Sequence, residues 1–110
     1  MEAPITTLPG VNYEGFTAAR ETRLRDEVNF EIPGNTSVGD LLVLAVTLDE
    51  SVATDLMKPL PGWTLLSVEP QPGMVALGIW TRIADGSEPS NGYKLDLNGA
   101  TQSFALVMRF

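Results

Sequence analysis

Turn-forming dipeptides divide this chain into short segments. The dipeptides are Pro9-Gly10, Pro33-Gly34, Pro61-Gly62, Pro72-Gly73, Asn91-Gly92 and Asn98-Gly99. Proline presets φ for the first corner of a turn, glycine accepts the positive φ that often follows, and Asn-Gly favours the tight turns of β-hairpins. The segments between these turns are too short for long helices and have the length of strands. The sequence therefore predicts an all-β fold, an antiparallel β-sandwich or jelly roll.

The composition is that of one folded domain. The 110 residues are 44% hydrophobic and include no cysteine, so no disulfide is expected and synthesis in a reducing cytoplasm is favoured. No apolar run approaches the ~20 residues that span a bilayer, and residues 1–4 lack the features of a signal peptide. We therefore expect no membrane partner.

The charge argues against nucleic acid as a partner. The formal net charge is −7, and the few basic residues cluster only within residues 20–27, where acidic residues interrupt them. Because phosphate backbones attract lysine and arginine, such a surface does not favour DNA or RNA.

Residues 1–15 are predicted to form an extended arm before a β domain of residues 16–110. The arm is rich in Thr, Pro and Gly and carries scattered apolar residues, of which Ile5, Leu8 and Tyr13 are candidate interface residues. Two interpretations stay open: a frayed terminus, or a strap that orders against a partner.

Alternating apolar residues predict the strands of the domain. Leu24, Val28, Phe30 and Ile32 fall on one apolar face, so a strand is expected over about residues 26–32, while residues 16–25 could instead hold a short helix. A helical turn is also open over residues 53–57. Near the C-terminus, residues 93–97 alternate cleanly, and the last strand is expected to turn inward the side chains of Phe104, Leu106, Met108 and Phe110.

The most apolar run, residues 41–48, is apolar on both faces. The outer face of a sandwich strand should be polar, but Leu41, Val43 and Ala45 would occupy it here. If these side chains stayed exposed to water, the protein would lose several kcal/mol of stabilisation, because burying one such side chain stabilises by ~1.5–3 kcal/mol. We therefore expect a cover on this face: the arm, a loop or another subunit.

The strand over residues 74–83 carries the second interface prediction. Alternation sets Met74, Trp80 and Arg82 opposite Leu77 and Ile79, and Trp, Met and Arg are enriched in interface cores. Trp80 could also stack on sugar rings, and core packing is the simpler explanation for both tryptophans. Trp63 is expected to plug one end of the sandwich.

The chain contains no histidine and no cysteine, which removes the commonest general base, nucleophile and metal ligands. A hydrolase would need a carboxylate pair, for which Asp85 with Glu88, or Asp49 with Glu50, are the candidates. Asp49, Glu50 and Asp55 could also hold calcium, although EF-hand spacing is absent. We expect no catalytic residues, no cofactor and no metal.

From about Phe30 onward the chain resembles a β-sandwich domain of bacteriophage virion proteins and some bacterial surface proteins. The matching segments are Ile32-Pro33-Gly34, Val38-Gly39-Asp40-Leu41-Leu42, Pro61-Gly62-Trp63-Thr64-Leu65, Ile79-Trp80-Thr81-Arg82-Ile83-Ala84 and Gly86-Ser87-Glu88-Pro89. The family's modules often lie within longer fibre-like chains, whereas this chain carries one module.

The resemblance implies a non-enzymatic virion structural protein, made in the host cytoplasm and located on the capsid surface. Its partners would be the major capsid protein and further copies of itself, as a homotrimer that decorates and cements the shell. The alternatives are a tail or tail-fibre component, a carbohydrate-binding module that uses Trp80, Met74 and Arg82 for a glycan, and a hydrolase that uses loop carboxylates.

Overall fold

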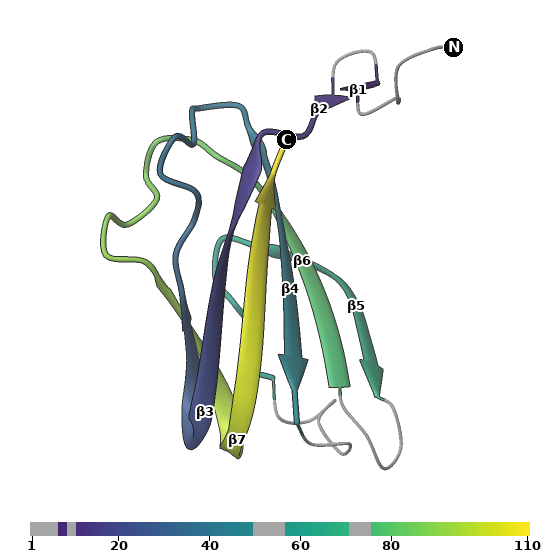
Figure 1. The fold of residues 1–110 in the computed structure, drawn as a ribbon, viewed down its shortest axis with the longest axis vertical. Coiled ribbons are helices and arrows are strands. Elements are labelled where there is room, and N and C mark those ends of the chain that lie inside the picture. The colour runs from purple at the N-terminus through teal and green to yellow at the C-terminus, as the bar shows by residue number, and fades with distance from the viewer. Residues whose placement is uncertain (1–6, 9–10, 50–56, 71–75) are drawn as a thin grey trace.

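The computed structural model describes residues 7–8, 11–49, 57–70 and 76–110, and these form an antiparallel all-β fold. Five strands make one sheet in the order β3-β7-β4-β6-β5, and β1 with β2 makes a short hairpin beyond its end (Figure 1). The strands are β1 (Thr7–Leu8), β2 (Val11–Asn12), β3 (Gly15–Phe30), β4 (Leu41–Leu48), β5 (Thr64–Pro70), β6 (Ala76–Ile83) and β7 (Tyr93–Arg109). The all-β, antiparallel prediction is confirmed. A sandwich or jelly roll is not confirmed, because the five long strands belong to one sheet.

A second layer arises because β3 and β7 double back on themselves (Figure 1). The pairing between them shifts register between Glu21 and Arg25, and again between Arg25 and Glu27. Beyond this bend the strands continue with Val28 opposite Leu95, and both side chains join the core that the sheet forms. Residues 16–25 are therefore strand rather than helix. Leu24, expected on the apolar face, lies at the bend and is 70% exposed.

The core lies on one face of the sheet, which we call the inner face. On β4 it receives Leu42, Leu44, Val46 and Leu48, each 0% exposed. The alternate residues of β4, Leu41, Val43 and Ala45, lie half-buried on the opposite, outer face. This confirms the faces that the sequence predicted for β4.

The structure reverses the faces predicted for β6 and β7. Leu44 pairs with Trp80 on one side and with Val107 on the other, so strand alternation places both on the inner face. Trp80 is 2% exposed and lies over Gly78, where an added Cβ would come within 2.6 Å of its ring. Correspondingly, the residues of β7 expected to point inward lie half-buried on the outer face: Phe104, Leu106, Met108 and Phe110.

Aromatic side chains close one end of the core, as predicted for Trp63. Its ring packs edge-on against Phe30 and Tyr93, with centroids 5.8 and 5.4 Å away, and Phe30 stacks on Tyr93. The helical turn left open over residues 53–57 lies almost wholly outside the described residues, and Met57 forms a bridge with Leu97.

Candidate interaction surface

The outer face of the sheet is a nearly continuous apolar surface. Strand register arranges its three central strands, β7, β4 and β6, in rows. Directly paired residues share a face of the sheet, because side chains alternate along each strand. The rows are Phe104, Thr47 and Leu77; Leu106, Ala45 and Ile79; Met108, Val43 and Thr81; and Phe110, Leu41 and Ile83. The only polar side chains in these rows are the threonines.

No described segment covers this face as the bent strands cover the inner one. Most of its side chains are partly buried, and two at its margins are more than half exposed: Phe16 on β3 at 58% and Ile83 at 59%. From strand spacing and rise, the face measures roughly 20 by 25 Å, or about 500 Å². That equals the largest apolar patch of a typical monomer, which is often functional.

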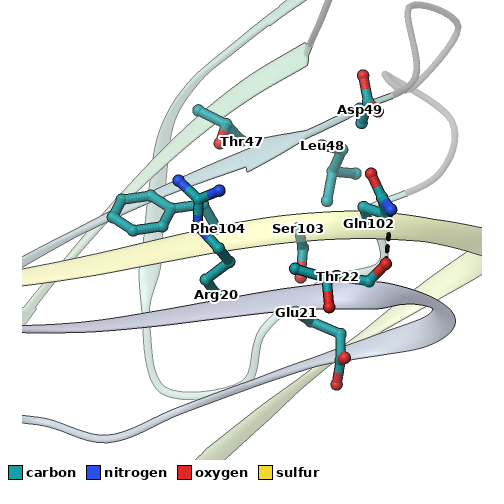
Figure 2. Close-up of a pocket in the computed structure, with 9 residues that line it drawn as sticks. All are labelled: Arg20, Glu21, Thr22, Thr47, Leu48, Asp49, Gln102, Ser103 and Phe104. Carbon is teal, nitrogen blue, oxygen red and sulfur yellow. Dashed lines mark hydrogen bonds between the residues drawn. The ribbon is translucent and has the colours of Figure 1, made fainter.

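Charges occur at the two edges of the outer face. On β3, Arg20 lies with its guanidinium carbon 5.9 Å from the centre of the Phe104 ring (Figure 2). A shallow groove of about 240 Å³ adjoins this pair, with Thr47 and Gln102 in its lining. On β5, at the opposite edge, Glu69 accepts a hydrogen bond of 2.9 Å from Ser67. Within the described ranges, neither Arg20 nor Glu69 forms an ion pair.

A second polar cluster surrounds Arg82 at the end of β6. Its guanidinium donates to Glu88 Oε2 at 2.8 Å and to the Gly62 carbonyl at 2.8 Å, and it lies 3.0 Å from Asp85 Oδ1. The side chains of Arg82 and Glu88 are 12% and 8% exposed. Arg82 was predicted as an interface residue on the Trp80 face; instead it fastens the loop that follows β6, because this loop folds over its guanidinium.

The loop carboxylates around Arg82 are not poised for acid catalysis. Hydrogen bonds from the Ser87 side chain and backbone lower the pKa of Asp85 to about 2. Burial opposes ionisation of Glu88, but hydrogen bonds from the Asp85 backbone and from Arg82 outweigh it and lower its pKa as well. A glycosidase-type pair needs one carboxyl with a raised pKa, to donate a proton near neutral pH. The lowered pKa values keep both carboxyls ionised near neutral pH, so Asp85 and Glu88 hold the loop in place through hydrogen bonds.

Side-chain and backbone hydrogen bonds bring most of the segments quoted for the family resemblance together at this end. Arg82 joins the turn at Gly62 to the loop at Glu88. The Gly39 N–H donates to the Ala84 carbonyl at 2.7 Å, and the Ala84 N–H donates to the Asp40 carbonyl at 2.8 Å. Arg109 extends the set, with Nη1 3.1 Å from Asp40 Oδ2. The resemblance is therefore carried by residues that hold the loops of the fold in place.

The predicted interface residues separate into three groups. Leu41, Val43 and Tyr13 belong to or border the outer face, where Tyr13 packs edge-on against Phe110 at 5.8 Å. Trp80 is buried in the core, so the predicted glycan platform of Trp80, Met74 and Arg82 is wrong. Ile5 and Met74 lie outside the described residues, and Leu8 lies in β1 with its side chain not described.

Sequence reasoning missed most of the outer face. The alternation of Leu77 with Ile79, and of Phe104 with Leu106 and Met108, was visible, but it does not say which face is buried. Gly78 was the available signal, because a glycine two residues before a tryptophan on a strand leaves room for the ring to lie inward. Of the three residues considered as possible calcium ligands, only Asp49 is described, and the described residues contain no group of three or more acidic side chains that could hold a metal.

Comparisons with known proteins found no relative: no family model, curated protein or solved structure matches this chain. The described part of the chain also contains no helix long and apolar enough to cross a membrane. The outer face is thus the surface from which a function has to be argued.

Proposed function

We propose that this chain is a structural protein of a bacteriophage virion, a capsid decoration protein that acts through surface contacts rather than catalysis. The location in a virion rests on the family resemblance. The mode of action rests on the outer face, which is the observation that carries the proposal.

An uncovered apolar sheet face of this size favours assembly over life as an isolated monomer. Side chains such as Val43, Ala45 and Leu106 occupy the centre of the face, where a purely structural sheet exposed to water would carry polar residues. Burying apolar surface stabilises by ~25 cal/mol for each Å² removed from water. The face therefore gains stability only when another protein surface covers it.

The loops at one end of the sheet also support a structural role. The Arg82 cluster and the Asp40–Arg109 contact fix the loops at one end of the sheet, and the loop carboxylates Asp85 and Glu88 are consumed in that task. A rigid module that assembles through one apolar face suits a shell that has many equivalent positions. The homotrimer that the resemblance implies stays a prediction.

The test is to locate the protein in particles made with and without it. A decoration protein leaves difference density on the shell, and particles that lack it release DNA at a lower temperature. Density confined to the tail would instead assign the tail-component alternative. If the protein is absent from purified particles, or if its loss changes neither the shell surface nor heat stability, capsid decoration is wrong.

A further inference from the structure

The two edge charges of the outer face lie in one row across the sheet. Arg20 on β3 pairs with Phe104, which pairs with Thr47 on β4. Thr47 pairs in turn with Leu77, and Leu77 pairs with Glu69 on β5. Arg20 and Glu69 therefore stand at opposite edges but at the same height along the strands, with β4 midway between them.

This arrangement is self-complementary about a two-fold axis parallel to β4. Rotation about such an axis, lying between two copies placed face to face, exchanges the β3 and β5 edges while keeping each row at its own height. Arg20 of one protomer then meets the partner's Glu69, and the contact occurs twice because a two-fold interface repeats each contact. A two-fold axis across the strands would instead set β3 over β3 and β5 over β5, so Arg20 of one copy would not meet Glu69 of the other.

We propose that the occupant of the outer face is a second copy of this chain, packed face to face about that axis. The inference rests on the proposed function in one respect. That function uses the outer face for assembly, and the inference names the protein that covers this face. The packed sheets complete a sandwich with the usual ~10 Å separation and near-aligned strands. Central apolar rows from both copies then fill the space between them.

The size and charge of the face suit a reversible dimer. The face of about 500 Å² is somewhat smaller than the ~800 Å² that each partner contributes to a standard stable interface. The net charge of −7 opposes association of copies in general. Among the described residues, no acidic side chain lies within the four apolar rows, although Asp49 adjoins the first row at the end of β4.

Charge reversal tests both the partner and its orientation. Sedimentation equilibrium of the full chain should show a monomer–dimer equilibrium. Arg20→Glu or Glu69→Arg alone should weaken the dimer about ten-fold, because each places like charges at both edge contacts. Lys58→Glu and Glu31→Arg make the same charge changes at exposed positions away from the outer face, and they should leave the dimer unchanged.

Restoration is the decisive result. An equimolar mixture of the Arg20→Glu and Glu69→Arg chains should form a heterodimer in which both edge contacts are again between opposite charges. The double variant should dimerise like the unmodified chain. Circular dichroism and melting temperature confirm that each variant is folded.

A chain that stays monomeric, or that forms a trimer, overturns the inference. So do single variants no weaker than their controls, or a mixture that does not restore the dimer. If the chain does not dimerise but is present on the shell, only the dimer inference is wrong. If the chain forms the charge-dependent dimer but is absent from particles, only the proposed virion function is wrong.

Discussion

The two faces of β4 are both largely apolar but have opposite surroundings. The inner face carries Leu42, Leu44, Val46 and Leu48, and the outer face carries Leu41, Val43, Ala45 and Thr47. The inner residues are fully buried because β3 and β7 bend back over them, whereas the outer residues are only partly buried. Apolar side chains thus occur on both faces of β4, but only the face over which β3 and β7 bend is buried within one chain. The inner face stabilises the fold, and the outer face remains for assembly.

Adjacent leucines provide the sharpest test of this difference, with the largest expected effect. Leu42→Ala removes a side chain that is 0% exposed, so the free energy of unfolding should fall by ~2–5 kcal/mol. Leu41→Ala, made at the neighbouring outer position, should cost ~1–2 kcal/mol in dilute solution, less than Leu42→Ala, because Leu41 is only partly buried. Urea denaturation at low protein concentration measures both. Equal losses for the two variants would contradict the assignment of the core to one face.

A smaller effect is expected where the inner face is packed most tightly. An alanine Cβ at Gly78 would lie 2.6 Å from the Trp80 ring and 2.7 Å from the Met57 sulfur. Gly78→Ala should therefore destabilise the fold by ~1–3 kcal/mol through overpacking, and should shift Trp80 fluorescence to the red as the ring is displaced. Thr47→Ala on the outer face is the control and should change neither. A neutral Gly78→Ala would mean that Trp80 does not lie over this glycine.

The smallest effect concerns the loop that covers the end of the inner face. The pKa of Asp85 is lowered from 3.8 to about 2, so its ionised form is favoured in the folded chain. A group with a depressed folded pKa adds stability above its unfolded pKa and loses it as pH falls through the folded value. Asp85→Asn should therefore be less stable than the unmodified chain at neutral pH. The difference should shrink between about pH 4 and pH 2, measured by urea denaturation across that range. A difference that does not vary with pH would show that Asp85 acts otherwise than through its charge.

The sequence predicted those features that depend on neighbouring residues. Turn chemistry indicated the all-β fold, and the two-sided apolarity of residues 41–48 indicated a second apolar face, with Leu41 and Val43 on it, that needs a cover. Trp63 was expected at the end of the core and is found there.

Features set by strand register could not be predicted in the same way. Shifting a strand by one residue exchanges its faces, so Trp80 and Phe104 were each assigned to the wrong side. The doubling back of β3 near Arg25 depends on register shifts against β7, which local pattern does not encode. The row that aligns Arg20 with Glu69 runs through five strands and emerges only when they are paired.

The central claim is that the outer face is covered when the protein is assembled. Because the chain has no cysteine, single-cysteine variants report on one position each. Ala45→Cys lies in the middle of the outer face, and Ala100→Cys, at an exposed position off that face, is the matched control. The measurement is the rate of maleimide labelling in dilute solution and in the assembled state, at dimer-forming concentration and in particles. We predict that assembly slows labelling at position 45 by at least ten-fold and leaves position 100 unchanged; equal rates at position 45 before and after assembly would contradict the claim.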